Sequence, residues 1–513
     1  MNPLEHPYSR YGIALVLYKT SKERFEEILD DDIKSLLING LDKFRLRPTY
    51  FNSEIEFSYV PYSEIKNNPG LKKGPSSKGK FLTPNSLTID KVASGYFDTI
   101  EKLISELNDK KQKNINFTQQ IVPVTTKTNY GRKTQGYISG DIRTAAFCAI
   151  TTSHPLKPCL AIVKVKQNIP NYIPAAIIPD LEIDELKNFI SIFERMLDDN
   201  TPKLLIARKK ENVEKIPRPK IFHGNFPYAP RSHAFGAAGL LGAIGQWAKE
   251  AEYIDKADPV LDSLANKPLY IVSYDRTEVV TFDHYVIELA KEYKLSNIVN
   301  ALEFSTLLKE EPKYIKGSRP NPKYELFWMM ASRFLQTFNK PAFQNFLAFR
   351  IEYQPEVEYL LNQYFMKKEN IRQEIVTSAK ELGRWLNLAA YIAASKQFEE
   401  RKKRKPLVGN KQDNVEVRKY KAKFLLELES SAFSARKPEA LLHQTIRRAA
   451  QLSFMDAPAE SQEFMDAVCS GELTLDQAKN LLLAYSRLKN VKEKSAPEEE
   501  ADELLEDSEI SEN

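Results

Sequence analysis

The C-terminal part of the chain carries a pattern that leaves few folds open to it. From about residue 324, apolar residues recur every three or four positions in one segment after another, which is the spacing of amphipathic helices. Prolines stand at the breaks between these segments, where the first turn of a helix tolerates them: Pro341, Pro355, Pro406, Pro438 and Pro458. The pattern predicts an all-α helical bundle over residues 326–494, with short connections.

Residues 1–325 follow a different pattern, in which short apolar runs alternate with long loops rich in Pro and Gly. Amphipathic spacing predicts helices at residues 21–41 and 183–197. Runs rich in β-branched and aromatic residues predict strands at residues 12–18, 54–60, 159–165 and 268–274. We expect an α+β N-terminal region with long basic loops, followed by the all-α C-terminal helical bundle.

The chain ends in an acidic segment. Residues 498–513 contain nine Asp and Glu and no Lys or Arg, which predicts a disordered acidic tail over residues 495–513. The whole chain has a formal net charge of +5, so residues 1–497 carry +14 once these nine acids are set aside. This excess favours a polyanionic partner such as nucleic acid.

Cysteine usage and hydropathy indicate the compartment. The three cysteines form no CxxC pair and no even-numbered framework, which argues against secretion, disulfides and structural zinc. The first twenty residues do not read as a signal peptide, and the longest apolar run, residues 234–247, is too short to span a membrane. We expect a cytoplasmic protein without a membrane partner.

Three loops of the N-terminal region combine positive charge with turn-forming and aromatic residues: residues 67–80, 125–143 and 208–231. Lysines and arginines hold phosphates, amides read base edges, and rings such as Phe222, Phe226 and Tyr228 can stack on bases. Each loop alone has the ordinary explanation of a solvated surface, but three in one region favour nucleic acid. The candidate contacts are Lys72, Lys73, Lys78, Lys127, Asn129, Arg132, Lys133, Arg208 and Lys209.

A second basic cluster lies in the predicted bundle. Residues 401–437 contain twelve Lys and Arg against four Asp and Glu. Such an excess can hold several phosphates along a strand, although bases at the end of a helix also complement its dipole. The candidate contacts here are Arg401, Lys402, Lys403 and Arg404.

No catalytic motif stands out. Four glycines between residues 235 and 245 are spaced three apart, which matches neither GxGxxG nor GxxxxGK[ST] and favours close helix packing instead. The Asp283-His284 pair has no second His-Asp set, and HExxH and GxSxG are missing. We therefore expect no catalytic residues, no metal site, no cofactor and no enzymatic activity.

Two C-terminal segments carry a resemblance to a known family: ELGRWLNLAAYIAA at residues 381–394 and ALLHQTIRRAAQLSFMDAPAESQEFMDAVCSGELTLDQAKNLLLAYSRL at residues 440–488. Together with a basic-looped α+β region ahead of a helical bundle, they resemble the large subunit of type I CRISPR surveillance (Cascade) complexes. The likeness is to the branch of type I-B and Myxococcus-like systems, which includes transposon-associated ones.

That resemblance implies a function and a set of partners. The large subunit of such a complex recognises the PAM in double-stranded DNA and stabilises the R-loop, while base pairing with crRNA reads the sequence. The implied partners are crRNA, target double-stranded DNA, the backbone and crRNA-end subunits and, in transposon-associated systems, transposition proteins. The family also implies a small subunit made from an internal start, which we expect at Met366, with Asn370 capping the next helix.

Two other functions stay open on the sequence alone. One is a nucleic-acid-processing hydrolase whose metal site leaves no motif, and the other is a protein-only scaffold with a solvated basic surface. Salt-dependent binding of DNA or crRNA would exclude the scaffold, whereas metal-dependent cleavage by the purified chain would support the hydrolase.

Replacing Lys127, Arg132 and Lys133 with Ala should weaken binding to target duplex and reduce its salt dependence. The reason is that each lost phosphate contact lowers the slope of log K against log salt by about one unit. Titrations at several salt concentrations measure both quantities. Unchanged affinity together with an unchanged slope would show that this loop does not contact DNA.

Overall fold

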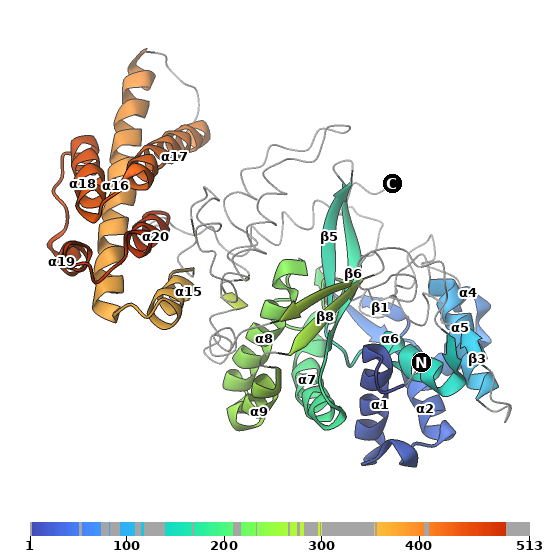
Figure 1. Cartoon of the computed structure of the whole chain (residues 1–513). Coiled ribbons are helices and arrows are strands. Elements are labelled where there is room, and N and C mark those ends of the chain that lie inside the picture. Colours follow the sequence, from blue (N-terminus) through green and yellow to red (C-terminus); the bar gives the residue numbers. More distant parts are fainter. Residues whose placement is uncertain are drawn as a thin grey trace. The chain divides into compact units, whose positions relative to one another are not determined.

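The computed structural model (Figure 1) describes residues 3–50, 54–72, 82, 93–107, 114–116, 139–166, 169–208, 217–231, 233–264, 267–273, 277–281, 296–297, 299, 353, 357–404 and 410–488. They fall into two compact units, one from the described residues up to 299 and one from those between 353 and 488. Small antiparallel sheets occur among the helices of the first unit, and the described part of the second consists of helices. The expected boundary near residue 325 and the tail over residues 495–513 lie outside the described residues.

Helix α1 (Pro7–Thr20) packs against α6 (Ile142–Ser153) and α7 (Ile183–Leu204) in the first unit. The helix has Pro7 in its first turn and ends at Ser21, which adopts a left-handed conformation with φ of 55°. Residues 12–18, expected to form a strand, lie in this helix. The prediction is wrong because residues 13–17 are completely buried, and a short, uniformly apolar run does not distinguish a buried helix from a buried strand.

The described residues of the first unit form three antiparallel sheets. Their strand orders are β1-β2-β7, β3-β4 and β5-β6-β8-β9. The strands are β1 (Leu46–Tyr50), β2 (Glu54–Tyr59), β3 (Asn114–Asn116), β4 (Ser139–Asp141), β5 (Cys159–Lys166), β6 (Ile169–Pro179), β7 (Ile206–Arg208), β8 (Pro268–Ser273) and β9 (Thr277–Thr281). The strands predicted at residues 54–60, 159–165 and 268–274 are confirmed by β2, β5 and β8.

Further helices complete the described part of this unit: η1 (Phe25–Glu27), α2 (Asp30–Leu41), α3 (Tyr62–Asn67), α4 (Pro69–Lys72), α5 (Ala93–Glu106), η3 (Lys220–Phe222), α8 (His233–Glu250) and α9 (Ile254–Leu264). The helix expected at residues 183–197 is confirmed and continues to Leu204. The helix expected at residues 21–41 is confirmed only from Asp30, where three acids favour a helix N-terminus.

The glycines of α8 pack as the spacing predicted. A Cβ atom added at Gly236 would lie 2.9 Å from Cδ2 of Leu160 and 3.0 Å from Cδ1 of Ile271, which belong to the third sheet. A Cβ atom at Gly239 would lie 2.6 Å from Cδ of Pro230. The rigid ring of Pro230 therefore requires glycine at position 239, whereas at position 236 a larger residue would have to displace the ends of the Leu160 and Ile271 side chains.

The connection between α6 and β5 runs entirely inside the first unit. Its backbone groups find partners in buried side chains, as buried polar groups must. Nδ2 of Asn225 donates to the carbonyls of Pro155 and Lys157 at 2.9 and 2.8 Å, and its Oδ1 accepts from the amide of Cys159 at 2.7 Å. Nζ of Lys157 donates to the carbonyls of Thr152 and His154, both at 2.9 Å.

Burial makes His154 sensitive to acid. Desolvation, followed by the positive charge of Lys157, lowers the pKa of His154 to about 3 from its usual 6.5. The folded protein therefore holds His154 neutral, whereas the unfolded chain binds a proton below about pH 6.5. The stability from this residue is complete above that pH and is lost as the pH falls toward 3.

Lowering the pH from 7 to 5 should therefore cost the first unit about 2 kcal/mol through His154 alone. The change His154→Asn removes the titrating ring while leaving an acceptor for the amide of Leu156, which donates to Nδ1 at 3.2 Å. Urea-dependent hydrogen exchange of the α6 amides measures the stability of this unit. An equal loss between pH 7 and pH 5 in the variant and the parent chain would contradict the assignment.

The second unit is a helical bundle, as the C-terminal pattern predicted. Helix α16 runs through its middle, and α17, α18, α19 and α20 pack against it (Figure 1). The elements are α15 (Val357–Gln363), the π-helical turn η4 (Tyr364–Lys368), α16 (Gln373–Arg404), α17 (Asn410–Ser434), α18 (Pro438–Ser453), η5 (Ala459–Ser461), α19 (Gln462–Ser470) and α20 (Leu475–Ser486). Pro438 occupies the first turn of α18, and the segments expected between residues 326 and 352 lie outside the described residues.

A buried ion pair joins α17 to the end of α20. Nε and NH2 of Arg487 donate to the two carboxylate oxygens of Glu429 at 2.6 and 2.8 Å, and these side chains are 2% and 6% exposed. The carbonyl of Arg487 accepts from the amide of Tyr353 at 2.7 Å. Removing one member of such a pair leaves an uncompensated buried charge, which is strongly destabilising.

Tyr485 and Ser486, at the end of α20, connect this helix to α15 and α16. The Tyr485 hydroxyl donates to Oδ1 of Asn362 at 2.6 Å, and Nδ2 of Asn387 donates to the carbonyl of Ser486 at 2.7 Å. A Cβ atom on Gly383 would lie 2.6 Å from Cβ of Tyr485, so α16 and α20 need glycine at their closest approach. The end of α20 thus holds three helices and the chain at Tyr353 together.

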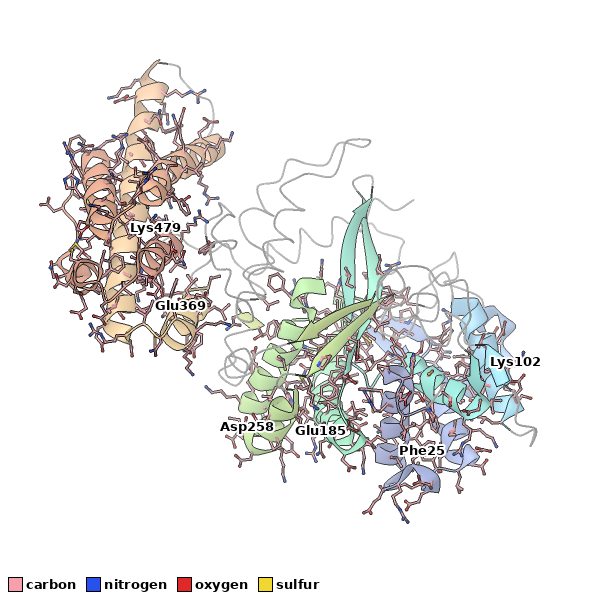
Figure 2. All side chains as sticks on the ribbon, in the orientation of Figure 1. Phe25, Lys102, Glu185, Asp258, Glu369 and Lys479 are labelled. Atoms are coloured by element: carbon pink, nitrogen blue, oxygen red, sulfur yellow. The ribbon has the colours of Figure 1, made fainter. Side chains whose placement is uncertain are left out.

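The boundary expected at Met366 is wrong. Met366 lies inside η4, which directly continues α15, and Asn370 has φ of 53° and precedes the first residue of α16, Gln373. Asn370 therefore does not cap α16. The Tyr364 hydroxyl donates to Glu369 (labelled in Figure 2) at 2.9 Å, so contacts cross this position. A chain starting at Met366 would lack the Asn362 partner of Tyr485.

The change Glu429→Gln should lower the unfolding free energy of the bundle by about 3–5 kcal/mol, because Arg487 would stay buried without its counter-charge. The matched control is Glu427→Gln, two residues away on the same helix, where the pair with Arg448 is partly exposed and should contribute about 1 kcal/mol or less. Hydrogen exchange of the α17 and α20 amides measures both effects. Equal losses in the two variants would contradict the role of the buried pair.

Candidate nucleic-acid interface

Most candidate contacts of the first unit lie outside the described residues: Lys73, Lys78, Lys127, Asn129, Arg132, Lys133 and Lys209. Two fall within them. Lys72 is the last residue of α4, and Arg208 is the exposed last residue of β7, opposite Glu54 of β2.

Described residues hold both ends of the first basic loop. Nε of the buried Arg45 donates to the carbonyl of Leu71 at 2.8 Å. The next residue, Leu46, exchanges backbone hydrogen bonds of 2.8 and 3.0 Å with Leu82. Adjacent residues thus anchor the chain on both sides of residues 72–81, so that the lysine-rich segment leaves and returns at one place.

Part of the third basic loop, residues 208–231, belongs to the hydrophobic core. Phe222 and Phe226, which we expected to offer stacking faces, are buried, so that prediction is wrong for both. The reason is local, because the amide of Ala161 in β5 donates to the carbonyl of His223 at 2.9 Å and draws this segment against the sheet. Tyr228 is exposed and keeps a face for stacking.

Arg401, at the basic end of α16, is bound by residues of α17. NH1 of Arg401 donates to Glu416 at 2.9 Å and to the Tyr420 hydroxyl at 2.8 Å, and both partners belong to α17. Nζ of Lys402 lies 5.8 Å from the ring of Phe398, and Lys403 is exposed. Arg404 is the last residue of the helix. The structure therefore brings the four candidates of this cluster to one end of the bundle.

Helix α17 continues this positive charge. Arg418, Lys419 and Lys423 are exposed, and Nζ of Lys419 lies 3.2 Å from Glu416, the same carboxylate that pairs with Arg401. We call Arg401, Lys419 and Lys423 the basic face; Arg418 lies about 140° around α17 from Lys423 and is on another side of the helix. Lys421 does not belong to it, since its side chain is 3% exposed. The sequence count of twelve bases therefore overstates the accessible charge.

Two exposed aromatic rings beside lysines were not recognised in the sequence. The ring of Phe454 is 82% exposed and lies 4.3 Å from Nζ of Lys396. Tyr391 is 45% exposed, with Nζ of Lys421 5.8 Å from its ring. Phe454 looked like one more apolar position of its helix, but the helix ends at Ser453 and Phe454 turns outward with φ of 60°. Rings with a nearby cation are suitable faces for stacked bases.

Acidic residues gather around α19. Residues 456–476 contain six Asp and Glu and no Lys or Arg, and they include α19, which packs on the N-terminal half of α16 through Ser378. Arg372 binds Glu463 and Glu472 there at 2.9 and 2.7 Å. The basic face lies beside the C-terminal end of α16, a helix of 32 residues that is about 48 Å long. The surface around α19 is therefore acidic, and the basic face lies away from it.

The described residues hold no group of three or more His, Cys, Asp and Glu side chains suited to a metal ion. Of the three cysteines, Cys148 and Cys159 are buried and Cys469 is exposed, and all three are free thiols. Within the same part of the chain, no helix is both long and apolar enough to cross a membrane.

The described part of the chain thus combines small antiparallel sheets with a helical bundle that carries exposed cations and exposed rings. The family model of CRISPR-associated protein Csp2 matches residues 6–489, and the chain belongs to that family. Membership supports the resemblance to the large subunit of a Cascade-type complex. No curated protein and no solved structure matches the chain.

Proposed function

We propose that this chain is the large subunit of a type I CRISPR RNA-guided complex, where it recognises the PAM in double-stranded DNA and stabilises the R-loop. Family membership over residues 6–489 supports the assignment to a CRISPR complex. The observation that carries a nucleic-acid role is the basic end of the bundle, where exposed cations and exposed rings share one scaffold. The type I-B or Myxococcus-like subtype, and an association with transposition proteins, belong to the same proposal.

The bundle is suited to hold the displaced strand. Lys419 and Lys423 contact phosphates, which requires no particular base sequence. Tyr391 and Phe454 provide planar faces on which bases stack, again without sequence preference. This division of labour fits a complex in which guide pairing reads the target and protein holds the backbone.

The first unit supplies the PAM contacts in this proposal. The segment between Leu71 and Leu82 is anchored at both ends by Arg45 and Leu46, so its lysines act from a fixed base. A rigid scaffold that presents loops is the usual arrangement for recognition. The partners are crRNA, target DNA, and the backbone and crRNA-end subunits, with a separate small subunit from Met366 still a prediction.

The proposal assigns binding and no catalysis to the chain, without a cofactor, in the cytoplasm. Cleavage of DNA or RNA by the purified chain in the presence of Mg²⁺ or Mn²⁺ would overturn the non-catalytic part. Absence of salt-dependent binding to any nucleic acid would instead favour a protein scaffold.

Replacing Lys419 and Lys423 with Ala should weaken binding of single-stranded DNA and lower the slope of log K against log salt by about 1.4 units, since each lost contact accounts for about 0.7. The matched control replaces Lys367 and Lys368, two lysines beside the N-terminal end of α16, and should leave the slope unchanged. Fluorescence anisotropy across a salt series measures both. Equal changes in the two double variants would mean that the basic face is not the binding surface.

A further inference from the structure

The chain leaves the bundle at a fixed point on α17. Arg487 is clamped to Glu429, and Leu488 pairs with Tyr353 in an isolated bridge. Everything after Leu488 therefore starts beside Glu429. The sequence that follows ends in residues 498–513, with nine acids and no base.

The basic face begins a short distance from that point. Lys423 and Lys419 lie six and ten residues before Glu429, which is about 9 and 15 Å along α17 and about 120° and 80° around it. Lys419 and Lys423 are four residues apart and lie next to each other on the exposed surface of the same helix. The exit of the chain and the basic face thus share one helix.

The connecting segment is long enough to bridge this distance. Residues 489–497 lie between the last described residue and the first acid of the tail. Nine residues reach up to about 30 Å when extended, which is about twice the distance along α17 to Lys419. The sixteen residues of the acidic segment can therefore lie along the basic face without any change in the bundle.

The surface around α19 repels the same segment. Six acids occupy residues 456–476 without a single Lys or Arg, and Arg372 is bound by Glu463 and Glu472. Like charges disfavour docking there, whereas Lys419 and Lys423 attract the tail. Charge complementarity therefore favours the basic face over the surface around α19.

We propose that residues 498–513 dock on the basic face and compete there with nucleic acid, an inference that rests on the function proposed above. The tail carries carboxylates that can meet Lys419 and Lys423, as the phosphates of a nucleic-acid backbone do. Because the tail is covalently attached, its effective concentration at this surface is high although each exposed ion pair is weak. Nucleic acid with more phosphate contacts displaces it.

Contact between tail and bundle can be tested without nucleic acid. A carbodiimide joins a carboxylate to a lysine amine only where the two meet, and mass spectrometry then locates the links in the full-length chain. Links from residues 495–513 should fall on Lys419 and Lys423 rather than on Lys367 and Lys368, and should disappear at about 1 M salt, where the Debye length is about 3 Å. Links that favour the control lysines, or that persist at high salt, would overturn the docking.

Competition needs a second measurement. A chain ending at Lys494, and a full-length chain with the nine tail acids changed to Gln and Asn, should each bind single-stranded DNA about fivefold more tightly at low salt, because several weak ion pairs are lost together. The gain should be abolished by combining either change with Lys419→Ala and Lys423→Ala. Equal affinity with and without the acids would overturn the competition, even if the links form.

Failure of the underlying function gives a different result. If Lys419→Ala and Lys423→Ala leave DNA binding unchanged in the chain that lacks the tail acids, the basic face does not bind nucleic acid. The proposed function of the bundle is then wrong, and so is the proposed competition, even if the cross-links form.

Discussion

The buried ion pair between Arg487 and Glu429 is the contact on which the arrangement of the bundle depends. Two charges taken out of water destabilise a fold unless they meet in good geometry, and here two short hydrogen bonds provide it. The pair sets α17 against the end of α20 and, through the carbonyl of Arg487, positions the chain at Tyr353. It also fixes where the acidic C-terminal segment leaves the bundle.

Buried polar groups have the same role in the first unit. Asn225 and Lys157 satisfy the backbone of the connection between α6 and β5, which would otherwise be costly to bury. Arg45 in turn donates to the carbonyl of Leu71, and the next residue, Leu46 of β1, forms a bridge with Leu82. In each unit, the contacts that are least accessible to solvent determine where the charged segments begin.

The basic face connects the bundle to its proposed work. Lys419 and Lys423 lie next to each other on the exposed surface of α17, so both act on a bound strand within a Debye length. The exposed rings of Tyr391 and Phe454 add faces for stacking.

The sequence by itself determined the features that depend on local periodicity and composition. Helical spacing and prolines predicted the bundle, and β-branched runs predicted β2, β5 and β8. Charge counts located the basic cluster of residues 401–404 at the end of α16. Tertiary structure decided the rest, because burial depends on neighbours that are distant in the chain. Residues 12–18 became a helix inside the core, and Phe222 and Lys421 became buried. Met366 came to lie inside a continuous helical segment, and Phe454 turned outward because its helix ends one residue earlier.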